Sequence, residues 1–379
     1  MHRFLLYAAA LLLASFESTA GAQPGPLHWV HPGADATHPV VRAGRFDLAF
    51  GPDQRPVLVS QASHGVELRR WTGTSWVGLA GLGFVNEFPM DVRAASNWAG
   101  DIVVAVRVSE PFGSSIRVFH LRGAQLVQIG TSHPVSEAGG FALGYDARGP
   151  VIAWAAGGFI TVKRWNGAAW IQLGGSVNPA VNAFRDPKSP ALAVTGDGRL
   201  IVADTRLTGE ASVIDARQWT GTGWVALGNG PPSPAQGPSL GGRDSGAPVV
   251  ASLGAVSQVH LWNGTDWIAA PSPCPPPALG ATLAPPVIDV AGNRIRVVCA
   301  IAAPALRRRL VASSFAPLSG WSQLGGGTIN GAIRLPAPLH LSYVARSAPS
   351  GQLWVAWTAA VDDGVGVIVS TLEPGGLTP

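Results

Sequence analysis

Charged residues are scarce in this sequence of 379 residues. Asp, Glu, Lys and Arg make up 13% of the chain, and Lys163 and Lys188 are its only lysines. With 47% hydrophobic residues, this composition excludes intrinsic disorder, which requires few apolar and many charged residues. The net charge is +4, and Arg307-Arg308-Arg309 is the only tight basic run. Nucleic-acid binding needs a clustered basic stripe and a reader motif, so no nucleic-acid partner is expected.

Cysteine is almost absent, with Cys274 and Cys299 as the only two residues. In an oxidising compartment such a pair predicts a disulfide, and two unpaired buried thiols are the alternative. The nine histidines show no His-x-His or His-Glu-x-x-His spacing, so we expect no metal site and no cofactor. No Gly-x-Ser-x-Gly elbow, phosphate-binding loop or dinucleotide fingerprint occurs, and no catalytic residue can be assigned.

Long hydrophobic runs are also missing, except at the N-terminus. Phe4 to Ala14 is apolar, follows the basic start Met1-His2-Arg3 and precedes the small residues Ala20-Gly21-Ala22. The run has roughly eleven residues, fewer than the ~20 that span a bilayer, so a membrane anchor is the weaker interpretation. The pattern predicts a signal peptide over residues 1–22 and a secreted or periplasmic mature chain, 23–379.

A Trp-x-Gly-x-x-Trp element recurs along the chain. Four complete copies start at Trp71, Trp165, Trp219 and Trp262 and end at Trp76, Trp170, Trp224 and Trp267. The central glycine suits the positive φ of a tight turn, which would place the two tryptophans on paired strands. Two further copies are degraded, one running from Leu121 to Leu126 and the other from Phe315 to Trp321. Because large apolar residues are kept at both ends, the element requires packing bulk rather than indole.

A short β-branched strand recurs seven times and sets the length of the repeat. Its copies begin at Pro56, Ile102, Pro150, Leu200, Pro248, Ile295 and Leu353. Their spacing lies between 46 residues (Pro56 to Ile102) and 58 residues (Ile295 to Leu353). Four short strands in each of seven such units predict an all-β fold, a seven-bladed β-propeller of four-stranded antiparallel blades.

The seventh unit lacks a fourth strand, because it ends at Glu373-Pro374-Gly375-Gly376. The isolated segment Leu27-His28-Trp29-Val30 has the right size and the same Trp-Val pair as Trp76-Val77. We therefore predict that this N-terminal strand closes the last blade, with Trp29 as its second tryptophan. A single domain then covers residues 23–379.

The blade period and the Trp-x-Gly-x-x-Trp turn resemble bacterial exported β-propeller repeat proteins of the kelch-like, Asp-box and seven-bladed lectin types. The resemblance covers about residues 25–379. Most blades lack the Gly-Gly pair of kelch repeats, and the Ser and Asp of Asp-boxes are missing although Gly-x-x-Trp remains. The arginine triad and nucleophilic tyrosine of sialidases have no counterparts that can be placed. The resemblance therefore implies a fold, and it carries no site residues over.

Two groups of residues are candidates for ligand contact. The repeated tryptophans could stack on sugar rings, but recurrence at one structural position favours packing between blades. The connections between fourth and first strands contain Asn86, Asn178 and Asn330, which either contact a ligand or cap a turn.

We expect a monomeric, noncatalytic binding module for a carbohydrate or a surface protein. The alternative is a glycan hydrolase or lyase with its site at the central mouth of the ring.

Overall fold

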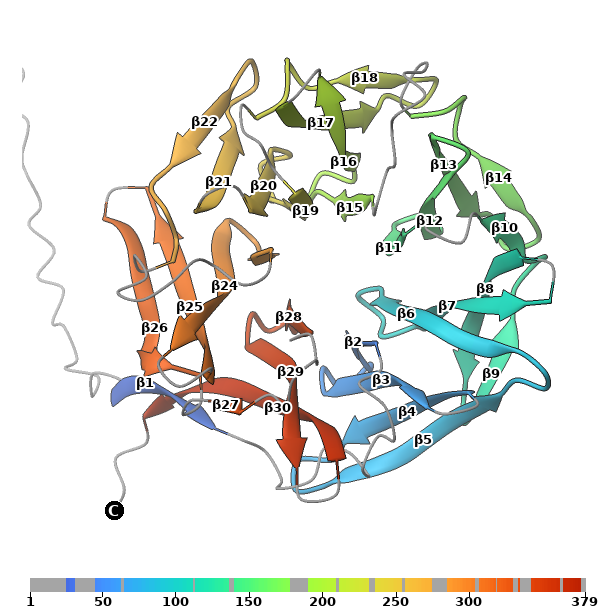
Figure 1. The fold of residues 1–379 in the computed structure, drawn as a ribbon, viewed down its shortest axis with the longest axis horizontal. Coiled ribbons are helices and arrows are strands. Elements are labelled where there is room, and N and C mark those ends of the chain that lie inside the picture. The colour runs from blue at the N-terminus through green and yellow to red at the C-terminus, as the bar shows by residue number, and fades with distance from the viewer. Residues whose placement is uncertain are drawn as a thin grey trace, which may run out of the picture.

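The computed structural model shows seven antiparallel sheets arranged as blades in a closed ring (Figure 1). It describes residues 25–30, 45–62, 65–111, 113–135, 140–177, 190–208, 211–231, 236–253, 256–274, 285–303, 307–317, 319–329, 333–334, 342–361 and 364–375. These residues form strands and turns and contain no helix. The described part of the chain therefore has no helix that could cross a membrane. The seven-bladed propeller predicted from the repeats is confirmed.

Within each blade, the first strand lies at the centre of the ring and the last at its outer edge. Blade one has β2 (Phe46–Phe50), β3 (Pro56–Ala62), β4 (Gly65–Trp71) and β5 (Trp76–Gly83). In blade two, β6 (Phe88–Ser96), β7 (Ile102–Glu110) and β8 (Gly113–Arg122) are flanked by a divided outer strand, β9 (Gln125–Gln128) and β10 (His133–Val135). Blade three comprises β11 (Phe141–Asp146), β12 (Gly149–Ala156), β13 (Phe159–Trp165) and β14 (Trp170–Gln172).

The remaining blades follow the same order. Blade four contains β15 (Ala191–Val194), β16 (Leu200–Thr208), β17 (Ala211–Trp219) and β18 (Trp224–Ala226). Blade five contains β19 (Gln236–Gly242), β20 (Pro248–Leu253), β21 (Ser257–Trp262) and β22 (Trp267–Ala270). Blade six adds the short β27 (Ile333–Arg334) to β23 (Val287–Ala291), β24 (Arg294–Ala303), β25 (Arg307–Ala316) and β26 (Gly320–Thr328). Blade seven is built from β28 (Tyr343–Ser347), β29 (Leu353–Val361), β30 (Gly364–Gly375) and β1 (Gly25–Val30).

The N-terminal strand closes the ring. β1 pairs antiparallel with β30, and Trp29 lies opposite Leu372 as Trp76 lies opposite Trp71 in blade one. The prediction that residues 27–30 supply the missing outer strand is therefore confirmed. Because blade seven combines the first strand of the ring, β1, with the last, β30, opening the ring requires loss of this pairing.

The hydrophobic core is divided among the seams, by which we mean the interfaces between adjacent blades. Each of its seven clusters combines buried side chains of two neighbouring blades. The second strands supply much of it, since they are apolar on both faces: Val103, Val104 and Ala105 of β7 are all fully buried. A β-branched strand that contacts a neighbour on each face is stable only inside a stack of sheets.

A repeated hydrogen bond joins the outer edges of neighbouring blades. The indole Nε1 of the second tryptophan donates to a backbone carbonyl of the preceding blade, just past its fourth strand or, for Trp29, within that strand. The pairs are Trp170 to Ile129 (2.9 Å), Trp224 to Leu173 (2.8 Å), Trp267 to Leu227 (2.7 Å), Trp321 to Pro271 (2.7 Å) and Trp29 to Leu324 (3.3 Å). A partly buried indole usually needs such an acceptor.

Glycine makes room for this contact. Gly130 follows the acceptor Ile129 with φ +71°, and a Cβ there would lie 2.5 Å from Cδ1 of Trp170. Gly174 and Gly325 repeat the arrangement against Trp219 and Trp29. The central glycines of the tryptophan elements also have positive φ, for example +99° at Gly167, as their turn requires.

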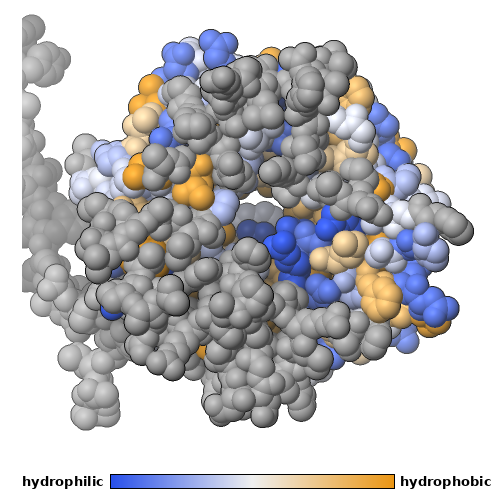
Figure 2. Space-filling model, viewed as in Figure 1, coloured by the Kyte–Doolittle hydropathy of each residue, from blue (hydrophilic) through white to orange (hydrophobic). Residues whose placement is uncertain are grey.

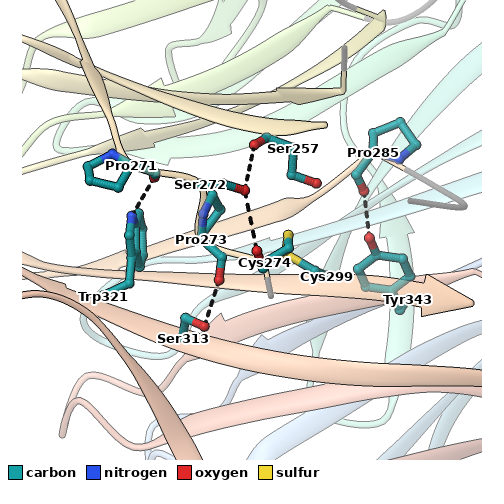
Figure 3. The surroundings of a disulfide bond; sticks show 10 residues. All are labelled: Ser257, Pro271, Ser272, Pro273, Cys274, Pro285, Cys299, Ser313, Trp321 and Tyr343. Carbon is teal, nitrogen blue, oxygen red and sulfur yellow. Dashed lines mark hydrogen bonds between the residues drawn. A yellow bond between two sulfur atoms is a disulfide. The ribbon is translucent and has the colours of Figure 1, made fainter. Parts of the chain in front are cut away.

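The structure contains the predicted disulfide, which crosses a seam (Figure 3). Cys274 follows β22 of blade five, and Cys299 lies in β24 of blade six. Ser313 Oγ, also in blade six, donates to the carbonyl of Pro273 at 2.8 Å. The bridge joins residues 25 positions apart, a loop length for which the chain-entropy model gives about 3 kcal/mol of stabilisation.

One histidine is buried against aromatic rings in the seam between blades two and three. His133 stacks on Trp154 with ring centroids 4.9 Å apart and meets the edge of Trp170 at 5.2 Å. Burial, with a smaller contribution from Lys163, lowers its pKa from 6.5 to about 4. The folded protein therefore holds His133 neutral.

Substitution of Gly130 tests the contact beneath Trp170. Gly130→Ala should lower the free energy of unfolding by about 3 kcal/mol, because it combines a disfavoured φ with a clash against the indole. Gly123→Ala is the matched control, since Gly123 has φ +61° with open space around its Cβ position; it should lose only about 1 kcal/mol. Urea unfolding measures both. Equal losses would show that the tryptophan contact imposes no requirement for glycine.

Acidification should destabilise the fold through His133. Between pH 6.5 and about 4 the unfolded chain binds a proton at this residue that the folded chain does not, so stability falls as the pH falls, by about 3 kcal/mol in total. His133→Phe should remove this part of the dependence when urea unfolding is compared at pH 7 and pH 5. His120→Phe, at a half-buried position, serves as the control and should change the dependence less. An unchanged pH dependence in His133→Phe would contradict the assignment.

Candidate functional site

The described structure places one of the three asparagines singled out in the sequence. Asn86 lies between β5 and β6, exposed, with φ +60°. Asn178 and Asn330 lie outside the described residues. The residue after Asn86 is Glu87, whose carboxylate accepts a hydrogen bond from Arg117 at 2.5 Å. This ion pair raises the pKa of Arg117 and fixes the connection that carries Asn86. A ligand contact for the three asparagines stays a prediction.

The repeated tryptophans lie along the outer edge of the ring, away from its centre. Within each complete Trp-x-Gly-x-x-Trp element the two rings are tilted against each other, with centroids 5.3 to 5.7 Å apart. Phe315 and Trp321 keep the same arrangement at 5.1 Å. Because the second tryptophan of five blades donates its Nε1 hydrogen to the preceding blade, we interpret these rings as packing at the seams.

A cavity of about 420 Å³ opens at the centre of the ring, and we call it the channel mouth. Its walls come from the inner strand of every blade, together with the residues that lead into those strands. Figure 2 shows the central hollow, with hydrophilic residues beside it on the side where Figure 1 places β6. The mouth therefore lies on the face where the connections between fourth and first strands enter the ring.

The channel mouth is cationic on one side. Arg45, Arg93 and Arg346 belong to blades one, two and seven, which are consecutive around the ring. Asp47 supplies the only carboxylate among the described residues that line the cavity. Each guanidinium carries five N–H donors in a planar fork, a geometry that matches carboxylates and sulfate or phosphate groups.

The carboxylate of Asp47 connects neighbouring blades. Asp47 is 2% exposed, and its carboxylate accepts hydrogen bonds from the backbone N–H of Leu48 at 2.8 Å and of Ala94, in blade two, at 3.1 Å. Arg346 of blade seven approaches the same carboxylate at 3.3 Å. One side chain thus joins three inner strands, which holds Arg346 at the mouth.

Arg93 is positioned from two sides. Its Nη1 donates to Asp91 at 2.7 Å and to the carbonyl of Val92 at 2.8 Å. Its guanidinium carbon lies 5.5 Å from the centre of the Phe141 ring in blade three, within the range of a cation–π interaction. These contacts orient the guanidinium before any ligand arrives.

The opposite side of the mouth is apolar and rigid. Pro190 leads into the inner strand of blade four, and Pro285 and Pro286 lead into that of blade six, whereas Pro238 lies within β19, the inner strand of blade five. Tyr343 donates its hydroxyl to the carbonyl of Pro285 at 2.6 Å (Figure 3), and burial raises the pKa of this phenol. The hydroxyls of Ser239 and Ser342 add polar groups at the same level. The mouth can therefore hold a ligand with an anionic end and an apolar face.

The sequence analysis did not identify the arginines of the channel mouth as candidate site residues, although their positions in the sequence could have indicated them. Arg93 and Arg346 interrupt apolar first strands, as Asp47 and Asp91 do, and charged residues in such strands are rarely without a partner. No group of three or more His, Cys, Asp or Glu in the described part of the chain could hold a metal ion.

Comparisons with known proteins found similarity in fold only. No family model matches the sequence, and no curated protein matches it. Among solved structures, the chain is similar to hydrazine synthase of Kuenenia stuttgartiensis at 11% identity and TM-score 0.52, with 88% of this chain and 97% of that chain covered. It is similar to the Dos1 propeller at 11% identity and TM-score 0.50, with 87% and 77% covered. It is also similar to the SapL1 lectin in complex with alpha methyl fucoside, at 13% identity and TM-score 0.46, with 89% and 98% covered. At these identities the first two likenesses, with TM-scores of 0.52 and 0.50, agree with the fold of this chain and say nothing more.

Proposed function

We propose that this protein is an exported, noncatalytic binding module that takes an acidic carbohydrate at the channel mouth. The observation that carries the proposal is the division of the mouth into an arginine side, from blades seven, one and two, and a proline side, from blades four, five and six. An acidic sugar has the same two parts, a carboxylate or sulfate and an apolar ring face. The guanidinium groups would bind the anion, and the proline side would pack against the ring.

The size of the mouth favours a carbohydrate over a protein surface. Its volume of about 420 Å³ lies within the range of small-ligand cavities. A stable protein partner would need to cover a much larger and flatter area. A sugar residue, or the end of a glycan chain, fits such a hollow.

The state of the carboxylates favours binding over hydrolysis. Glycoside hydrolases generally use two carboxyl groups that flank the scissile bond, one of them as a proton donor. Asp47 at the mouth already accepts two backbone N–H bonds and faces Arg346. Asp91 likewise accepts bonds from Val92 and Arg93. Both carboxylates are already occupied by structural partners, so neither is free to flank a scissile bond.

Binding is tested with the full chain and a set of acidic and neutral oligosaccharides. We expect an acidic glycan to bind, and higher salt to weaken binding because it screens the charges. Arg45→Gln and Arg93→Gln should each weaken binding about tenfold or more in calorimetric titration. Arg148→Gln, an exposed change in the turn between β11 and β12, is the matched control and should bind normally. Unchanged affinity in both mouth variants would refute the proposed site, and cleavage products from any glycan would establish the hydrolase alternative.

Export is the second part of the proposal, and the disulfide supports it. Cys274 and Cys299 are paired, which is typical of proteins that fold in oxidising compartments. Expressed with residues 1–22 in a host with a general secretion pathway, the chain should be recovered outside the cytoplasm. N-terminal sequencing should begin at Gln23, and thiol labelling under denaturing conditions should find no free cysteine. Cytoplasmic protein that retains Met1 would contradict export.

A further inference from the structure

The outer strand of blade one is longer than those of the next four blades. β5 has eight residues, whereas β9, β14, β18 and β22 have three or four. Each of these shorter strands ends at the residue before the carbonyl that accepts the indole N–H of the following blade. Blade two has Leu126 in place of its second tryptophan, so this bond to blade one is missing. The outer strand of blade one continues to Gly83.

β5 also leaves one edge open. It is the last strand of its sheet and pairs only with β4 among the described residues, and Figure 1 shows it at the outer perimeter of the ring. Edge strands of soluble proteins are usually short or contain charged residues or proline, which prevent pairing with another chain. β5 reads Trp-Val-Gly-Leu-Ala-Gly-Leu-Gly, without a charge or a proline. Its free edge is therefore able to pair with a further β-strand.

A β-bulge at Leu79 decides which side chains of β5 share a face. Gly78 lies opposite Arg69 of β4, and Ala80 lies opposite its neighbour Leu68, so Leu79 is the extra residue. In a regular strand, residues an odd number of positions apart lie on opposite faces. The extra residue reverses this rule across the bulge. Residues on either side of Leu79 that are three or five positions apart therefore lie on the same face.

With this bulge, the segment from Val77 to Leu82 is self-complementary. Antiparallel pairing with a second copy about a two-fold axis can place residues of like face opposite each other, as antiparallel pairs require. The facing pairs are Val77 with Leu82, Gly78 with Gly81, and Leu79 with Ala80. Glycine then meets glycine, and apolar side chains meet apolar side chains. A two-fold interface needs such self-complementarity, because the same surface of both copies forms it.

The two glycines of this segment have no explanation within a single chain. Neither Gly78 nor Gly81 has a positive φ. A Cβ at Gly78 would meet no described atom within 4 Å, and one at Gly81 would meet only the carbonyl oxygen of Val66, at 3.8 Å. Glycine inside a strand lowers stability and often marks the close approach of another backbone. Pairing with a second copy supplies that backbone.

Charged side chains beside these glycines are complementary in the same pairing. On β4, Arg69 lies opposite Gly78 and Glu67 lies opposite Gly81. Glu67 is exposed, and neither residue has an ion-pair partner among the described residues. The pairing puts Arg69 of one copy and Glu67 of the other at the ends of a row, with the two glycines between them. Their Cα atoms are three strand spacings apart, about 14 Å, and extended arginine and glutamate side chains can meet over glycine.

We propose that two copies of this chain pair edge to edge through β5, antiparallel and about a two-fold axis, so that their first blades form one continuous sheet. The backbone groups of the two edges bond to each other, Val77 packs against Leu82 of the second copy, and Arg69 pairs with Glu67 of the second copy. This pairing occupies the open edge of both copies, so it ends with a dimer rather than a growing fibre. The dimer differs from the monomer expected from the sequence.

Sedimentation velocity of the full chain over a range of concentrations tests the proposal. We expect a dimer whose fraction rises with protein concentration. Glu67→Arg places like charges at the ends of both rows and should raise the dissociation constant about tenfold. The double variant Glu67→Arg with Arg69→Glu reverses both charges and restores the attraction, so its dissociation constant should return close to the original value.

A second variant tests the apolar contact across the axis. Val77→Lys puts a charge against Leu82 of the second copy and should also raise the dissociation constant about tenfold or more. Ile171→Lys is the matched control, because Ile171 follows the second tryptophan of blade three as Val77 follows that of blade one, and the two side chains are 48% and 41% exposed. The outer strand of blade three has only three residues, so this control should dimerise normally.

Both lysine variants change exposed positions, and thermal unfolding checks that they fold. The proposal is overturned if the full chain is monomeric at every concentration. It is also overturned if Val77→Lys and Glu67→Arg dimerise like the unaltered chain, because the contact then lies elsewhere. Assembly that grows beyond the dimer would contradict closure by a two-fold axis.

Discussion

The structure depends on the seam, because a four-stranded blade has two apolar faces and can bury neither alone. All seven core clusters lie between blades rather than within one. The tryptophan bond to the preceding blade and the glycine beneath it act at the outer edge, and Asp47 acts at the inner edge, where it joins three blades. Stability is therefore a property of neighbouring pairs, and ring closure provides every blade with two neighbours.

Closure also sets up the channel mouth. At the centre, seven inner strands converge, and their few charged residues meet across a hollow, with arginines on one side and prolines on the other. Such a hollow is suited to a ligand with a negative charge and an apolar face.

The tryptophan elements show how a repeated motif can be misread as a ligand site. Their rings look suited to sugars, yet the indole nitrogens of Trp170, Trp224 and Trp267 are occupied by carbonyls of the preceding blade. Recurrence at one structural position in the blades therefore identifies these rings as packing.

The sequence by itself determined the architecture, because strand period, turn glycines and burial pattern are local properties that recur seven times. The sequence also predicted the ring closure, because the seventh unit lacks a fourth strand and the segment around Trp29 could supply it. It predicted the disulfide because the chain has only two cysteines. Tertiary structure alone decided which charged residues meet: Arg45, Arg93 and Arg346 are far apart in the chain, and only the ring brings them to one mouth.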